Sequence, residues 1–406
     1  MKNDMTNDMT KGNPVKLILL FSIPLLIGNV FQQFYSMVDT IIVGRFVGVD
    51  ALAAVGSTGS MVFLVNGFAT GLTSGFAVLV SQKFGAKDEK GLRKATASAI
   101  TLTVISVIVA TIVSLLGAKP LLKLMNTPEN IMGDAYIYVK IIYGGIIATV
   151  AYNFIASILR ALGDSKTPLY FLIVSSVLNI ILDLVFIINF KMGVAGAAYA
   201  TIISQGVSAI LCLIYTYKRF TILRLKKEDF NVKRRYYHKH LKIGIPMALQ
   251  FSITSIGIMT VQGALNVFGS TVIASYTAAS KALQLVMQPA ITFGVTMATY
   301  CGQNLGAKEY GRIKEGVKEC TKISIITSII AGAVLMFLGK YFVMMFISNP
   351  DAEVLKYAQQ VLDISAIFFI PLGLIFIYRN ALQGIGDSFV PMMAGAYELI
   401  ARALVA

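Results

Sequence analysis

The chain has 406 residues, of which 56% are hydrophobic and 14% are charged, and it carries a formal net charge of +15. Soluble domains contain about 25% charged residues, so this composition excludes an ordinary soluble protein. Many separate apolar runs of about 18 residues or more predict an all-α polytopic membrane protein.

Six apolar segments predict the helices of a first bundle, residues 1–217. The first segment carries Pro24, which removes a backbone hydrogen bond and can kink a helix. The second is rich in Gly and Ser, which suits close helix packing, and a polar loop at 81–94 separates it from the third. The predicted segments lie at about 15–42, 51–80, 95–116, 135–159, 168–189 and 194–217.

A basic stretch at 218–242 predicts a cytoplasmic linker, in which we expect His238 and His240 to lie in a solvated loop. The remainder, 243–406, predicts a second bundle with helices at about 243–268, 272–300, 318–340 and 353–383. An eleventh helix begins at Pro391, and the chain stops at Ala406 inside it. We therefore expect this bundle to be incomplete in this sequence, without the end of helix 11 or any helix 12.

Four pairs of matching motifs relate the two halves. IP at 23 recurs at 245, SQKFGAK at 81 recurs as GQNLGAK at 302, TP at 127 recurs as NP at 349, and GDSKTP at 163 recurs as GDSFVP at 386. All four offsets lie between 221 and 223 residues, which chance does not explain. An even number of helices per half gives both halves the same orientation, so the sequence predicts two parallel, pseudo-symmetric six-helix bundles.

Lysine and arginine gather in alternate loops. There are five at 83–94, ten at 218–242 and five at 308–322. The positive-inside rule places these loops, and with them the N-terminus, in the cytoplasm of a protein of the inner membrane. Basic loops that face anionic lipid account for the net charge, so no nucleic-acid partner is expected.

Two carboxylates lie within the apolar helices of the first half. Asp39 is on the first helix, and Asp183 is on the fifth, four residues after Asn179 and on the same helix face. A charge inside the bilayer costs about 2.5–3.5 kcal/mol even on lenient scales, so it needs a partner, water or a cation. The predicted topology brings these residues and Thr201 of the sixth helix to the outer part of one bundle. Their hard oxygens suit a proton or, as a metal, Na⁺.

These residues also have a structural interpretation. Asn179 and Thr201, taken singly, are typical of hydrogen bonds between membrane helices. The second half has no equivalent acids, and its intramembrane charges are Lys281 and the pair Glu398 and Arg402. Because that pair is spaced i, i+4, an ion pair is its simplest interpretation.

No motif in the sequence predicts an enzyme. A G-x-x-x-x-G-K-[ST] loop is absent, which argues against ATP-driven transport by this chain. An H-E-x-x-H zinc site is absent as well. The GDS turns at 163 and 386 predict helix starts, with Asp or Ser as N-cap and Pro in the first turn.

Taken together, these features resemble the multidrug and toxic compound extrusion (MATE) family over the whole chain. The resemblance is carried by the spacing from Pro24 to Asp39, the SQKFGAK and GQNLGAK pair, and the parallel halves. The chain looks most like the DinF-like branch, which has an Asp on helix 1 and Asn-x-x-x-Asp on helix 5. The resemblance implies that Pro24 bends helix 1, and that a cation site is formed by Asp39, Asn179, Asp183, Thr201 and Tyr35.

The resemblance further implies a monomeric antiporter, without a resident cofactor, that exchanges inward-moving H⁺ or Na⁺ for organic cations and amphiphiles. Gln250 stands where the NorM-like branch has an acid, which argues against a second cation site. Candidate residues of the substrate cavity are Gln33, Gln250, Gln262 and Lys281. Two alternatives stay open. A lipid-linked oligosaccharide flippase would be expected to line its cavity with several cations, and a passive channel needs no acid site.

Overall fold

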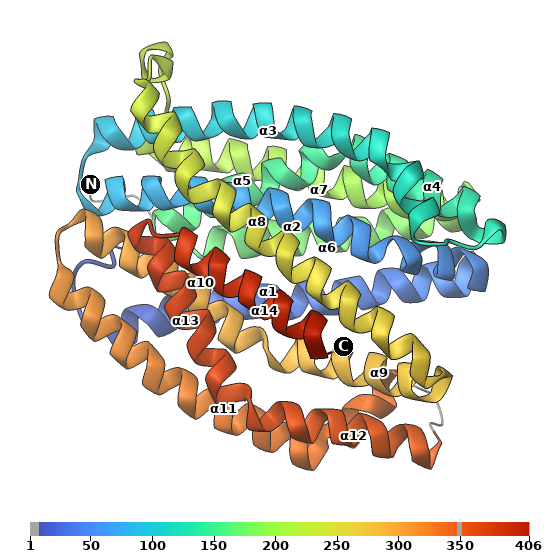
Figure 1. Ribbon diagram of the computed structural model, residues 1–406. Coiled ribbons are helices and arrows are strands. Elements are labelled where there is room, and N and C mark those ends of the chain that lie inside the picture. The colour runs from blue at the N-terminus through green and yellow to red at the C-terminus, as the bar shows by residue number, and fades with distance from the viewer. Residues whose placement is uncertain (1–7, 347–350, 406) are drawn as a thin grey trace.

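The computed structural model describes residues 8–346 and 351–405, and this part of the chain is almost entirely helical, without a strand (Figure 1). The NP motif at 349 lies outside these residues. The first half comprises α1 (Pro14–Phe46), α2 (Val49–Gly85), α3 (Glu89–Leu124), α4 (Glu129–Gly144), α5 (Ile146–Ala161), α6 (Lys166–Leu184), a π-helical turn (Val185–Asn189) and α7 (Gly193–Arg219).

The second half follows two short 3₁₀ turns, Thr221–Leu223 and Lys227–Phe230. It comprises α8 (Arg234–Leu265), a 3₁₀ turn (Asn266–Phe268), α9 (Ser270–Val286), α10 (Gln288–Gly306), α11 (Tyr310–Phe346), α12 (Ala352–Ile367), α13 (Phe369–Ile385) and α14 (Phe389–Val405).

Most of these helices are long and apolar enough to cross a membrane. Within the described residues seven helices qualify singly, and two pairs, α4 with α5 and α12 with α13, qualify as spans bent by 47° and 54°. The bent pairs occupy the predicted fourth and tenth helices, which are equivalent in the repeat. The eighth predicted helix corresponds to α9 and α10 together, and the eleventh to α14.

The outward face of α3 shows how the protein meets lipid. Ile108, Val113 and Leu116 on this helix are 54%, 63% and 75% exposed. In water such a continuous apolar surface would be costly, whereas in a bilayer it matches the hydrocarbon. This face and the apolar spans establish a multi-pass membrane protein.

The prediction of a polar loop at 81–94 is wrong in its length. Helix α2 continues to Gly85 and α3 begins at Glu89, so only residues 86–88 form the turn. The Asp88 carboxylate caps α3 by accepting the backbone N–H of Gly91 at 2.8 Å. Polar residues had suggested a loop, but at the membrane surface they form the solvated ends of two long helices.

Helix α8 begins at Arg234 and therefore already covers the end of the predicted linker at 218–242. The expectation for His240 is wrong, because this side chain is completely buried. Its Nε2 lies 3.0 Å from the carbonyl oxygen of Ala95, and its ring packs edge-on against Phe76. His238 is exposed, as expected.

The two GDS turns are helix starts, as predicted. Asp164 Oδ1 accepts the backbone N–H groups of Lys166 and Thr167 at 2.9 and 3.0 Å. Asp387 Oδ1 accepts that of Val390 at 3.3 Å. These carboxylates satisfy N–H groups that the first turns of α6 and α14 leave without an intrahelical partner.

The first helix of each half crosses to the other half. Helix α1 packs on α10 and α11 as well as on α6, and α8 packs on α2 and α3 as well as on α14. Figure 1 shows α8, in yellow, running from beside α3 to beside α9. The two halves are therefore joined by an exchange of helices and not by the linker alone.

The SQKFGAK and GQNLGAK motifs meet each other at the end of the two halves that the positive-inside rule predicts to be cytoplasmic. A Cβ atom added to Gly85 would lie 1.8 Å from the carbonyl oxygen of Gln303, and one added to Gly306 would lie 1.8 Å from that of Gln82. Only glycine permits this backbone approach. We call the meeting of residues 81–87 with 302–308 the inner contact.

Two glutamines extend the inner contact symmetrically. Gln82 donates its side-chain N–H to the carbonyl oxygen of Gly384 at 3.1 Å, and Gln303 donates to that of Ala161 at 2.9 Å. Each bond runs from one half to the end of a helix in the other. The N-terminal segment joins them, because the backbone N–H of Met9 donates to Gln303 Oε1 at 2.9 Å.

Helices α2 and α8 separate with increasing distance from the inner contact. Added Cβ atoms on Gly75, Gly71 and Gly67 would lie 2.5, 2.7 and 3.4 Å from their nearest atoms in α8. Still farther out, an added Cβ on Gly59 of α2 or Gly263 of α8 would meet nothing within 4 Å. The halves are therefore closed against each other at the inner contact and diverge toward the opposite end, which the topology predicts to be the outer one.

A methyl group at the inner contact tests its importance. We expect Gly85→Ala to destabilise the protein by about 1–3 kcal/mol, as overpacking does, because the Gln303 carbonyl must move away. Thermal unfolding of the purified protein measures this. The control is Gly133→Ala on α4, where an added Cβ meets nothing within 4 Å. Equal unfolding temperatures for Gly85→Ala and Gly133→Ala would contradict the close backbone approach at the inner contact.

Candidate cation site

Three helices of the first half bring the predicted site residues to one depth. Asp39 lies seven residues before the end of α1, Asp183 lies six before the end of the π-helical turn, and Thr201 lies eight after the start of α7. At about 1.5 Å per residue, each lies about 9–12 Å below the outer end of its helix. The predicted outer location in one bundle agrees with these positions.

Asn179 ties two of these helices together. In the orientation that suits both neighbours, its amide N–H donates to Asp183 Oδ2 at 2.9 Å, and its oxygen accepts the backbone N–H of Thr201 at 3.1 Å. Asn179 and Asp183 are both fully buried. One amide thus fixes the position of a buried carboxylate relative to α7.

Asp39 and Asp183 face each other across α1 and α6. Their carboxyl groups lie within hydrogen-bonding reach of one another. Within the described part of the chain, one oxygen of each, Oδ1, is buried without a hydrogen-bond partner. Asp183 is fully buried and Asp39 is half-buried. Two such carboxylates side by side repel each other, so a proton or a cation between them would stabilise the pair.

Two tyrosines complete the surroundings of the acids. The hydroxyl of Tyr35 lies within reach of a hydrogen bond to Thr201, as the predicted grouping requires. Tyr138 of α4 was missed by sequence reasoning. It packs against the same hydrophobic cluster as Val38 of α1 and Ile180 of α6, the helices that carry the acids. Only its depth could have indicated it, because Tyr138 lies about 13 Å along α4, close to the depth of the acids.

Pro24 is buried inside α1, which continues as one helix from Pro14 to Phe46. The neighbouring Gly28 allows close packing, because an added Cβ would lie 3.4 Å from Leu169 of α6. Bending at Pro24 remains a prediction.

The four candidates for the substrate cavity are dispersed. Gln33 is half-buried on α1, Gln250 is buried on α8, and Gln262 and Lys281 are exposed. Among the described residues, no hydrogen bond joins any two of these four. Gln250 instead accepts the side-chain N–H of Gln383 at 2.7 Å.

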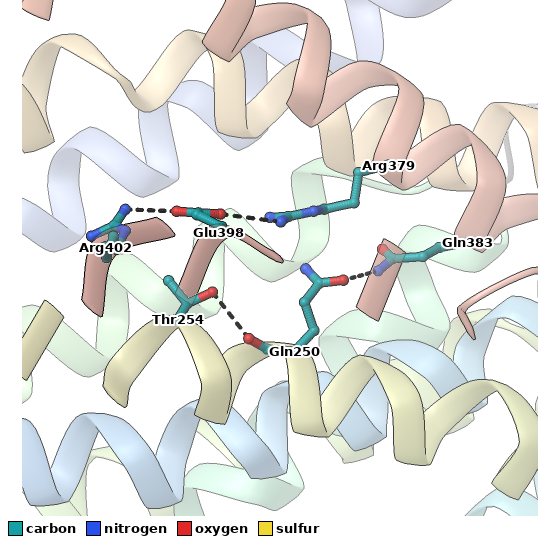
Figure 2. Close-up of polar contacts among 6 residues, drawn as sticks. All are labelled: Gln250, Thr254, Arg379, Gln383, Glu398 and Arg402. Carbon is teal, nitrogen blue, oxygen red and sulfur yellow. Dashed lines mark hydrogen bonds and ion pairs between the residues drawn. The ribbon is translucent and has the colours of Figure 1, made fainter. Parts of the chain in front are cut away.

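The predicted ion pair of the second half is present, and a second arginine joins it (Figure 2). Arg402 donates to Glu398 Oε1 at 2.6 Å, and an η-nitrogen of Arg379 lies 3.5 Å from Oε2 of the same carboxylate. Sequence reasoning missed Arg379, which comes from α13. The second half thus carries a cationic group, whereas the first half carries acids.

Comparison with known proteins identifies the family. A family model described as MatE matches residues 24–185 and again 246–406. The chain belongs to the MATE family. The two matches begin at Pro24 and Pro246, so the family model also recovers the internal repeat.

Relatives and solved structures of the MATE family cover nearly the whole chain. The probable multidrug resistance protein YpnP of Bacillus subtilis is 33% identical over 93% of this chain and 84% of its own length. The probable multidrug resistance protein YoeA of the same species is 30% identical over 97% of this chain and 86% of its own. A crystal structure of MATE in the straight conformation has a TM-score of 0.91, with 24% identity over 98% of this chain and 89% of that one.

These comparisons confirm the predicted family, the helical membrane fold and the expectation that the protein is a transporter and no enzyme. The DinF-like branch remains a prediction.

Removing one carboxylate tests the site. We expect the coupling ion to stabilise the purified protein and so to raise its unfolding temperature, because the ion binds the native state. At an ion concentration of 100 times Kd, this binding adds about 2.7 kcal/mol to the free energy of unfolding. Asp183→Asn should lose this stabilisation. The measurement compares Na⁺ with choline at fixed ionic strength, and then a pH series. Asp134→Asn, at an exposed acid on α4, should respond as the wild type does. An unchanged response in Asp183→Asn would contradict the site.

Proposed function

We propose that this MATE protein is a secondary active antiporter that couples inward movement of H⁺ or Na⁺ to the export of amphiphilic compounds, organic cations among them. The observation that carries the proposal is the pair of carboxyl groups, Asp39 and Asp183, each with one buried oxygen that has no hydrogen-bond partner among the described residues. A passive channel has no need for such a costly pair. The multidrug resistance relatives support the same function.

The proposed mechanism is competition between ion and substrate. An ion that enters from the outside neutralises Asp39 and Asp183. Helix α1 then bends near Pro24, and the bound compound is released outside. When the inner contact opens, the ion leaves to the cytoplasm and the acids regain their charge. The inner contact, closed while the halves diverge outward, supports access to the site from outside at the start of this cycle.

The same proposal includes where and how the protein works. The basic segments at 83–94, 218–242 and 308–322 support an inner-membrane location with a cytoplasmic N-terminus. A complete cation site within one half supports a monomer as the working unit, with H⁺ or Na⁺ as coupling ion and no resident cofactor.

Transport under separate gradients tests the proposal. Proteoliposomes loaded with a cationic dye are exposed to a pH gradient or a Na⁺ gradient, and dye movement is followed by fluorescence. We expect one gradient to drive dye movement in the wild type. Asp39→Asn should reduce it about tenfold or more, as the loss of a charged contact does. Asp134→Asn serves as the matched control.

Three results would contradict the proposal. The first is dye movement that neither gradient changes. The second is ionic current without dye movement, which indicates a channel. The third is full gradient-driven transport by Asp39→Asn, which would remove this residue from coupling.

A further inference from the structure

The second half contains a three-residue charge cluster inside the membrane. Glu398 on α14 is shared by Arg402, one helical turn away, and by Arg379 of α13 (Figure 2). The distances are 2.6 Å to Arg402 and 3.5 Å to Arg379. The Arg379 side chain is 12% exposed, whereas those of Glu398 and Arg402 are 39% and 36% exposed. The arginine with the weaker contact is thus the more deeply buried one.

The cluster lies well inside the predicted membrane span of its half, beside the buried glutamines. Glu398 is nine residues from the start of α14, which places it about 13 Å along this helix. An added Cβ on Gly395 would lie 3.6 Å from the Gln250 side chain and 3.8 Å from an Arg379 nitrogen. The Gln250 and Gln383 pair therefore borders the cluster.

The cluster of two arginines and one glutamate carries a net charge of +1. Arg402 suffices to pair the carboxylate, so Arg379 is the surplus cation. Its Nε–H is buried and has no hydrogen-bond partner among the described residues. An arginine inside a membrane is costly, and an unused guanidinium donor adds to this cost. A structural ion pair alone leaves both the second arginine and its free donor unexplained.

We propose that Arg379, with Arg402, forms an anion-accepting subsite for transported compounds that carry a carboxylate or a similar oxyanion. A guanidinium binds such a group through two parallel hydrogen bonds, and the free Nε–H is one of the donors required. Because the first half holds acids and the second half this cationic cluster, the favoured substrates are zwitterionic amphiphiles. The inference rests on the proposed export function and names its substrate class.

A matched pair of dyes tests the subsite. The probes are a rhodamine free acid, which is a zwitterion, and its methyl ester, which is a cation of nearly the same shape. Initial rates of ion-driven transport are measured at dye concentrations below saturation. For Arg379→Gln we expect transport of the acid to fall about tenfold or more, as expected when a charge-assisted hydrogen bond is lost. Transport of the ester should change less than about twofold, which is below 0.4 kcal/mol.

Two further variants guard against a folding defect and an effect of net charge. Arg379→Gln leaves Glu398 paired with Arg402, so no buried carboxylate is stranded. Glu398→Gln removes the competing anion and should lower the KM for the acid severalfold. Arg45→Gln changes the net charge equally at an exposed outer position and should transport both dyes as the wild type does.

The outcomes separate this inference from the proposed function. If the wild type transports neither dye under any gradient, the proposed antiport itself is wrong. If it transports the ester and rejects the acid, or if Arg379→Gln slows both dyes equally, antiport stands and the anion subsite is overturned. An increased KM for the acid in Glu398→Gln would also overturn it. If Arg379→Gln fails to reach the membrane, the Glu398→Gln result decides.

Discussion

The rest of the structure depends on the backbone approach at the inner contact. Gly85 and Gly306 sit where any side chain would collide with a carbonyl of the opposite half. With the halves fixed there, α2 and α8 diverge outward, and the Asp39 and Asp183 pair lies on the diverging side of one half. The site needs no contribution from the other half to hold its acids together, so the halves can move apart or together without dismantling it.

Charge is divided between the halves although the fold is repeated in both. The first half places two acids against each other, and the second places two arginines around one acid. Pseudo-symmetry therefore governs the backbone, the helix exchange and the inner contact, whereas the polar side chains have diverged. In the proposed cycle each half thus has a distinct role: we propose that the first responds to a small cation and that the second presents positive charge to a larger compound.

Much of this was predictable from the sequence, for identifiable reasons. The repeat, the spans and the Asn179 to Asp183 spacing follow from hydropathy and from periodicity along one helix. Prediction failed where contacts cross between helices. Arg379 lies on a different helix from its partner Glu398, Tyr138 lies on a different helix from each of the two acids, and burial of His240 depends on α3. The polar motif at 81–87 looked like a loop because its glycine serves a contact more than 200 residues away.

The reciprocal glutamine bonds have a consequence for kinetics. Gln82 and Gln303 each hold a helix-end carbonyl of the opposite half, and one pseudo-twofold axis relates the two bonds. A rotation about this axis that breaks one hydrogen bond also breaks the other. A partial opening would therefore leave both side-chain amides without a partner before water could replace the carbonyl groups. Opening to the cytoplasm should therefore be all-or-none, with water replacing both partners together. Such a barrier would keep leakage low between turnovers, because intermediate openings are scarcely populated.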